Sequence, residues 1–102
     1  MVMKILLTAR HCEVNDEIRE RAELVMQRAA KRAHRPQRAE VVFDIDHNQH
    51  IVELQLYLPK NNPFVATAEA ADFRTALDRA EEKLRKQLDK SHPASEKRAA
   101  GF

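Results

Sequence analysis

The sequence contains few of the residues from which several common functional sites are built. It has one glycine, Gly101, one cysteine, Cys12, and no tryptophan among its 102 residues. A glycine-rich phosphate loop needs more than one glycine, and a lone cysteine forms no internal disulfide, which favours a reducing compartment. No stretch approaches the ~20 apolar residues of a membrane span, and the start, Met1 to Ala9, is too short for the apolar region of a signal segment. We therefore expect a cytoplasmic protein that does not cross a membrane.

Charged residues are abundant, but their two signs nearly balance. Charged side chains make up 33% of the sequence and hydrophobic ones 43%, and the formal net charge is +2. These proportions are typical of a soluble globular protein, and a chain of this length usually forms one domain. So small a net charge excludes indiscriminate binding to nucleic acid, but it allows a local basic surface.

Four segments of the sequence have the pattern of β-strands. Apolar and polar residues alternate with a period of two over 39–47 and 51–58, which is typical of strands with one buried face. The polar residues 47–50 predict a hairpin between these two strands, and residues 59–63, with a proline at each end, predict a second turn. The four predicted strands are 3–9, 39–47, 51–58 and 64–70.

Two amphipathic segments predict helices. Asn15 suits the cap of the first helix, because its side-chain oxygen can accept a free backbone N–H. This helix should run to about His34, since a proline follows two residues later. The second helix should begin near Asp72 and run to about Lys90, where another proline follows.

The order of these elements predicts an α+β fold, β-α-β-β-β-α. A strand–helix–strand crossover prefers a parallel pair of strands, and hairpins add antiparallel neighbours. We expect a four-stranded mixed sheet with the two helices packed on one face and the other face open. One domain should span residues 1–92, and residues 93–102 should form a disordered tail.

Basic residues collect along one flank of each predicted helix. On a helical wheel these flanks run beside the apolar stripes, with acidic residues on different arcs. Such cations often only cover the edge of a core or pair with nearby acids, as Lys86 can with Glu82. If the two flanks meet, they form a groove that suits an RNA backbone, because each neutralised phosphate releases counterions. The basic residues are Arg21, Arg28, Lys31, Arg32 and Arg35 in the first segment and Arg79, Lys83, Lys86 and Lys90 in the second.

The open face of the predicted sheet carries Glu40, Asp44, Asp46 and Glu53, with Tyr57 as its main aromatic residue. An acidic surface repels phosphate, and a platform for stacking bases needs several aromatic side chains. We therefore expect contact with RNA through the helices, which would read its backbone and shape.

The second predicted helix resembles the closing helix of a known family, the ribosome hibernation-promoting factors. These proteins are also called ribosome-associated inhibitors or ribosomal subunit interface proteins. The start of the first helix, Val14 to Arg19, is similar to theirs as well, whereas Phe73-Arg74 departs from the Met-Tyr that the family usually has there. The residues that carry the resemblance in the last helix are Asp72-Phe73, Ala76-Leu77-Asp78, Lys83-Leu84, Gln87-Leu88 and Lys90.

The resemblance implies a function and a partner. It implies binding to ribosomal RNA of the small ribosomal subunit, in the channel used by messenger and transfer RNA, and inhibition of translation in stationary phase or stress. It implies no cofactor and no small-molecule substrate, and the length is that of the short members, which lack a dimerisation domain. The basic residues that match the family pattern are Arg28, Lys31, Lys83, Lys86 and Lys90. The other four basic residues are predicted from the helical wheel alone, and they are Arg21, Arg32, Arg35 and Arg79.

Other classes of protein fit the sequence less well. A generic double-stranded-RNA-binding module shares a β-β-β-α core, but it lacks the leading strand and has glycines in its loops. His11 and Cys12 are adjacent, which is not how a nucleophile and its base are usually arranged. His47 and His50 have no further ligand at a suitable spacing for a metal ion. We therefore expect neither an enzyme nor a metal site. The sequence leaves open whether the protein pairs ribosomes or only blocks the decoding channel.

Overall fold

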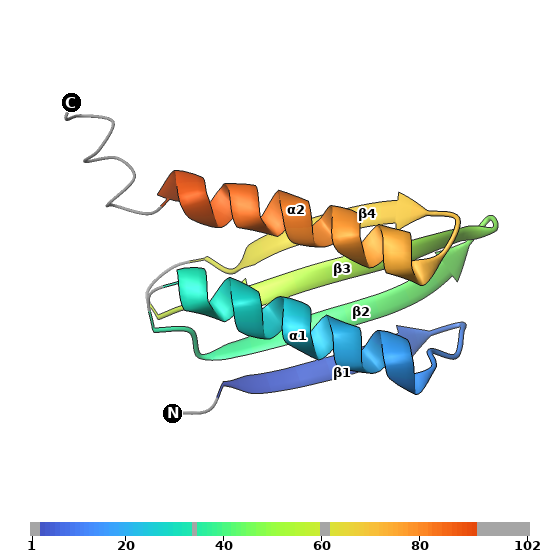
Figure 1. The fold of residues 1–102 in the computed structure, drawn as a ribbon, viewed down its shortest axis with the longest axis horizontal. Coiled ribbons are helices and arrows are strands. Elements are labelled where there is room, and N and C mark those ends of the chain that lie inside the picture. The colour runs from blue at the N-terminus through green and yellow to red at the C-terminus, as the bar shows by residue number, and fades with distance from the viewer. Residues whose placement is uncertain (1–2, 34, 60–61, 92–102) are drawn as a thin grey trace.

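The computed structural model describes residues 3–33, 35–59 and 62–91 of the chain. These residues form four strands and two helices in the predicted order (Figure 1). The predicted tail, residues 93–102, lies outside the described residues. The elements are β1 (Lys4–Arg10), α1 (Asp16–Arg32), β2 (Arg38–Asp46), β3 (Gln49–Tyr57), β4 (Phe64–Ala70) and α2 (Phe73–Ser91).

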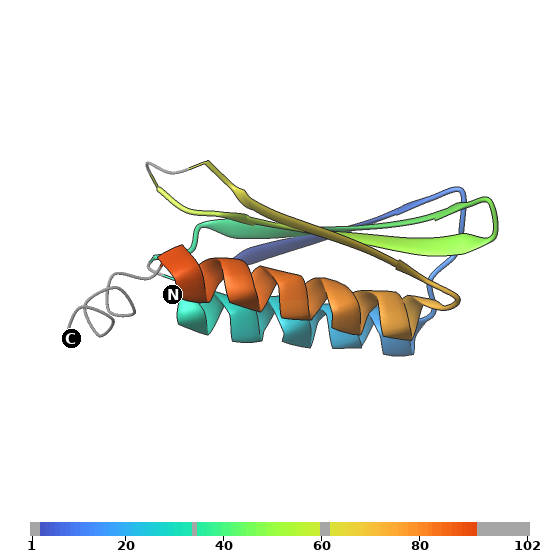
Figure 2. The same cartoon turned by 90° about the horizontal axis from the view of Figure 1, so that it is seen from above.

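The four strands form one mixed sheet in the order β1-β2-β3-β4. β1 and β2 are parallel, and the other two pairs of neighbouring strands are antiparallel. Both helices lie on the same face of the sheet, so the molecule has two layers (Figure 2). The α+β prediction is therefore confirmed, including the mixed sheet and the open face.

The core lies between the sheet and the two helices. Alternate residues of β2 and β3, such as Val41, Phe43 and Leu54, are fully buried against the apolar stripes of the helices, which include Met26 and Leu84. Burial of this apolar surface is the main term that favours folding. It holds both helices in fixed positions on the sheet, and so it also fixes the positions of the charged residues on their flanks.

Truncation of Leu84 is expected to test this core. Leu84→Ala leaves a cavity under α2, which should lower the free energy of unfolding by about 2–5 kcal/mol. Leu24→Ala is a matched control, because Leu24 is on α1 and 52% exposed whereas Leu84 is 0% exposed. Urea denaturation measures both values. Equal losses for the two variants would contradict the described packing of α2.

The helix starts agree with the sequence prediction. The side chain of Asn15 accepts the backbone N–H of Ile18 at 2.9 Å, and the side chain of Asp72 accepts that of Thr75 at 2.8 Å. Hydrogen bonds from Thr75 also lower the pKa of Asp72. α1 ends at Arg32, earlier than predicted, because Ala33 already has extended backbone angles.

The first hairpin is tighter than the sequence suggested. Only His47 and Asn48 form the turn, with φ angles of 51° and 64°, and the predicted loop residues Gln49 and His50 belong to β3. Two residues with positive φ form the turn type that matches the twist of a two-stranded hairpin. Asparagine adopts this geometry more readily than most residues, so the chain makes the turn without glycine.

Candidate nucleic-acid interface

The arginines of α1 pair with carboxylates of α2. Arg21 lies 3.1 Å from Asp78, and Arg32 lies 2.9 Å from Asp89. Arg28 makes two hydrogen bonds to Glu81, at 2.9 and 3.1 Å, and this contact raises the pKa of Arg28. These three pairs form a ladder along the two helices, which we call the interhelical ladder.

The ladder shows that the groove suggested by the helical wheels is wrong in its geometry. The basic flank of α1 faces the acidic arc of α2, and so it does not face the predicted basic flank of that helix. A wheel gives the angle of a residue around one helix, but it does not tell which side of the helix faces its neighbour. Three of the nine predicted cations therefore already have a carboxylate partner on the other helix.

One further cation, which the wheel did not select, faces α1. Arg85 of α2 lines a small hollow between the helices, together with Arg28 and Arg32 of α1. The hollow has a volume of about 210 Å³, and its only acidic lining residue among those described is Glu81. Arg85 is also held at 3.0 Å from Glu82 on its own helix. Positive charge thus remains between the helices, although ion pairs reduce it.

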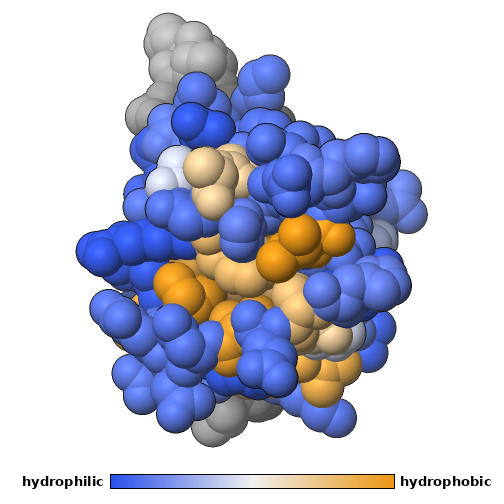
Figure 3. All heavy atoms as spheres, turned by 90° about the vertical axis from the view of Figure 1, so that its right-hand side faces the viewer, coloured by the Kyte–Doolittle hydropathy of each residue, from blue (hydrophilic) through white to orange (hydrophobic). Residues whose placement is uncertain are grey.

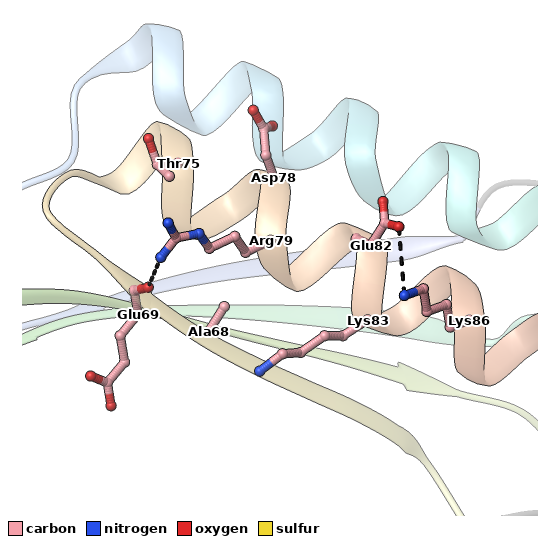
Figure 4. A pocket seen from close by; sticks show the side chains of 8 residues that line it. All are labelled: Ala68, Glu69, Thr75, Asp78, Arg79, Glu82, Lys83 and Lys86. Atoms are coloured by element: carbon pink, nitrogen blue, oxygen red, sulfur yellow. Dashed lines mark hydrogen bonds and ion pairs between the residues drawn. The ribbon is translucent and has the colours of Figure 1, made fainter.

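The predicted basic flank of α2 lies over strand β4 instead. Arg79 donates a hydrogen bond to the backbone oxygen of Glu69 at 2.9 Å (Figure 4). Lys83 donates one to that of Thr67 at 2.8 Å. Gln87 continues the series to Val65 at 2.8 Å. Four helical residues rise ~6 Å, which is close to the rise of two strand residues, so successive side chains meet successive carbonyl groups.

These backbone contacts leave the charge of Arg79 and Lys83 intact, because a carbonyl oxygen is a neutral partner. The two side chains line a hollow of about 590 Å³ together with Lys86 (Figure 4). Glu82 lies beside them and is 3.8 Å from Lys86, as the sequence suggested. The surface over β4 therefore carries three cations, although Glu69, Asp78 and Glu82 line the same hollow.

Cations also gather at one end of the molecule. α1 and α2 run in the same direction and end side by side (Figure 1). Lys31 and Arg32 lie in the last turn of α1, and Lys90 lies in the last turn of α2. We call this the basic end and define it by Lys31, Arg32, Arg35, Lys86 and Lys90. Within the described parts of the chain, Lys31, Arg35 and Lys90 form no ion pair with a carboxylate.

The opposite end has a different character. Asp16 and Glu17 lie in the first turn of α1, Asp72 precedes α2, and the hairpin between β2 and β3 begins after Asp46. Figure 3 views this end and shows apolar side chains between polar ones. Acids at helix starts and bases at helix ends both complement the helix dipole. That ordinary role accounts for part of the polarity. Arg19 and Arg74 also lie near the helix starts, so this end is mixed in charge.

The residues considered for chemistry lie apart from this surface. The Nδ1 atom of His11 is 3.1 Å from Asp44, while Cys12 is half-buried and its Sγ points to the backbone oxygen of Phe43. Burial and the nearby Asp44 raise the pKa of Cys12, which disfavours the thiolate form needed for nucleophilic attack. His50 packs edge-on against Phe73, with 4.6 Å between ring centres. Among the described residues, no three His, Cys, Asp or Glu side chains are grouped to hold a metal ion.

The fold and the charged surface together define a class: a small two-layer α+β domain whose two parallel helices carry basic residues at one end. Residues 5–94 match the profile of a family described as Sigma 54 modulation protein / S30EA ribosomal protein. The match spans most of the chain, and the protein therefore belongs to this family. No helix in the described residues is long and apolar enough to cross a membrane.

Solved structures of other proteins support the same assignment. The N-terminal domain of Protein Y from Thermus thermophilus is 31% identical, with a TM-score of 0.72, and the alignment covers 84% of this chain and 96% of that one. A ribosomal subunit interface protein from Coxiella burnetii is 25% identical, with a TM-score of 0.75, and the alignment covers 86% and 96%. A search of curated proteins finds no match.

Proposed function

We propose that this protein binds the small ribosomal subunit through ribosomal RNA in the messenger and transfer RNA channel and inhibits translation in stationary phase or stress. One observation carries the proposal: cations collect at the end where both helices terminate, in a chain that belongs to a family of ribosomal proteins. One solved relative is named a ribosomal subunit interface protein, which supports a ribosomal partner.

RNA phosphate is the ligand that suits this surface. Lys31, Arg35 and Lys90 have no carboxylate partner among the described residues, so contact with phosphate breaks no ion pair. Each neutralised phosphate releases counterions, and this release is the main source of affinity that does not depend on sequence. A patch of several such cations at one end also orients the protein as it approaches the RNA.

The nine predicted residues contribute unequally in this proposal. Arg79 and Lys83 are held by neutral carbonyl groups and keep their charge for the RNA. Arg28 and Arg32 are exposed and Arg21 is half-buried, but all three are paired, so each must exchange a carboxylate for a phosphate. Lys31, Arg35 and Lys90 should therefore dominate the affinity. Arg79 and Lys83 should come next, with Lys86, whose contact with Glu82 is longer at 3.8 Å.

We propose a regulatory and not a catalytic role, exerted in the cytoplasm where ribosomes act. The family is one of ribosome-associated proteins and not an enzyme class, and the arrangement of His11, Cys12 and Asp44 does not prepare a nucleophile. Occupation of the channel needs only affinity and bulk, because messenger and transfer RNA must pass through the same space.

Sedimentation and cell-free translation together test the proposal. The protein should sediment with small subunits in a sucrose gradient and should leave them as salt rises, with a log–log slope of roughly −4 to −7 for about 5–8 phosphate contacts. A stoichiometric amount should inhibit cell-free translation. Equal affinity for an unrelated RNA duplex, with no inhibition, would point to a generic double-stranded-RNA-binding module and would overturn the proposal.

A further inference from the structure

The strand register places different residues at the two ends of the open face of the sheet. Side chains that share this face meet across neighbouring strands. At the hairpin end, Asp44 of β2 pairs with Ile51 of β3, which pairs with Glu69 of β4. At the other end, Lys4 of β1 pairs with Arg38 of β2, which pairs with Tyr57 of β3. Acidic residues lie along the whole face, with Glu40 beside Arg38, but two cations and the tyrosine gather at this second end.

The Lys4, Arg38 and Tyr57 side chains form what we call the aromatic corner. The guanidinium carbon of Arg38 lies over the Tyr57 ring, 4.3 Å from its centre. Cross-strand pairing brings the two side chains together, and attraction between the cation and the ring adds to their contact. The Arg38 side chain is still 50% exposed, so the guanidinium is not enclosed by this contact.

Hydrogen bonds hold the aromatic ring in place. The Tyr57 hydroxyl donates to Gln55 at 2.6 Å, and the Gln55 amide donates to Glu53 at 3.2 Å. Glu40 is the nearest acid to the corner, but its carboxylate is 4.0 Å from Arg38, at the limit of an ion pair. Lys4 forms no ion pair among the described residues. The corner thus presents a fixed ring, a flat cation and a free ammonium group.

We propose that the aromatic corner binds one unpaired base of RNA, with the base on the exposed side of the Arg38 guanidinium and the adjoining phosphate on Lys4. Unpaired bases stack on aromatic rings and on arginine planes, and arginine adds attraction between cation and ring. The positive charge of Lys4 and Arg38 complements the phosphate. This site rests on the proposed function for its RNA, but it lies on the face of the sheet that the helices do not cover.

The position of the corner connects it to the surface already described. β1 and β2 begin, and β3 ends, at the same end of the molecule at which α1 and α2 end (Figure 1). A single strand of RNA that leaves the basic end can therefore pass around this end of the sheet to the corner. The acidic residues Asp44 and Glu69 are at the far end of the open face and do not oppose it.

The single tyrosine of the chain makes a direct experiment possible, since Tyr57 is the only one. Biosynthetic replacement by fluorotyrosine gives one fluorine NMR resonance, which reports on the corner alone. We expect that resonance to shift when the full chain is titrated with single-stranded oligoadenylate of about eight nucleotides. An abasic oligomer of the same length and charge, or an oligoglutamate peptide, should cause little shift. If the abasic oligomer or the oligoglutamate peptide shifts the resonance as much as oligoadenylate does, the proposal is overturned.

A conservative substitution tests the role of the flat cation. Arg38→Lys keeps the charge but loses the plane, so it should weaken binding of oligoadenylate about tenfold, in the range known for a stacked base. It should leave binding of the abasic oligomer unchanged. Arg10→Lys is the matched control at the far end of β1. Equal weakening for both oligomers would show that Arg38 acts only as a charge and would overturn the stacking site.

The same experiments separate failure of this site from failure of the proposed function. A fluorine shift with oligoadenylate in a protein that does not sediment with ribosomes would support the corner and refute the ribosomal role. Sedimentation with ribosomes, without any shift on either oligoadenylate or small subunits, would support the ribosomal role and refute the corner.

Discussion

Reversal of Lys86 and Lys90 together is expected to release the protein from the small ribosomal subunit. Both residues belong to the basic end, and Lys90 has no carboxylate partner among the described residues. Two lost phosphate contacts should weaken binding by roughly 30-fold at about 0.1 M salt, before the repulsion of the two new carboxylates is added. The log–log salt slope should become shallower by about 1.5 units. Sedimentation of Lys86→Glu, Lys90→Glu over a series of salt concentrations measures both effects.

A variant with the same change in net charge supplies the control. Arg19→Glu with Arg74→Glu alters two exposed arginines near the starts of α1 and α2, at the opposite end of the molecule. Arg19→Glu loses the 3.1 Å hydrogen bond from Arg19 to the Val14 backbone oxygen, but the helix dipole favours glutamate near a helix start, so the fold should tolerate the change. This variant should bind ribosomes nearly as well as the unaltered protein. If it loses as much affinity, net charge and not the basic end is responsible.

Removal of the acids from the interhelical ladder is expected to tighten RNA binding while it weakens the fold. Asp78→Asn, Glu81→Gln and Asp89→Asn leave Arg21, Arg28 and Arg32 without charged partners. If all three arginines then contact phosphates, affinity should rise roughly 10-fold to 100-fold at about 0.1 M salt, and the salt slope should steepen by about 2 units. Exposed ion pairs contribute little each, so the free energy of unfolding should fall by only about 1–2 kcal/mol.

The opposite signs of these two effects make the prediction specific. Urea denaturation measures the stability, and a filter-binding assay with ribosomal RNA measures the affinity. Glu20→Gln, Glu23→Gln and Glu69→Gln form the control, because these acids make no ion pair with a cation among the described residues. An equal gain in affinity for the control would mean that the ladder does not withhold its arginines from RNA.

Local patterns were enough to predict most of the fold. Alternation over β2 and β3 located both strands within two residues at either end, and Asn15 and Asp72 marked the helix starts. The hairpin loop was predicted too long because His47 and Asn48 have the positive φ angles that glycine usually supplies. The alternation of apolar and polar residues along a strand predicts which of them are buried. A two-residue turn without glycine has no comparable pattern that would mark its position in the sequence.

The candidate site was harder to predict, because it depends on which helix flanks face each other. The pairing of Arg28 with Glu81 joins residues 53 positions apart, and no periodicity within one helix reveals it. The same holds for Arg38 and Tyr57, whose contact depends on the exact pairing of β2 with β3. The parallel direction of the helices follows from the strand order, and together with the acids of α2 it would have suggested an interhelical ladder.

The hydrogen bond from Lys83 to Thr67 has a consequence for the strength of the proposed RNA binding. A free lysine samples many side-chain conformations, and it loses that freedom when it meets a phosphate. Here the ammonium group is already anchored by the Thr67 carbonyl at 2.8 Å, and two of its three N–H donors remain for other partners. Part of the entropy loss thus occurs during folding instead of binding, so Lys83 acts as a preordered cation whose contact with phosphate is more favourable than that of a mobile lysine.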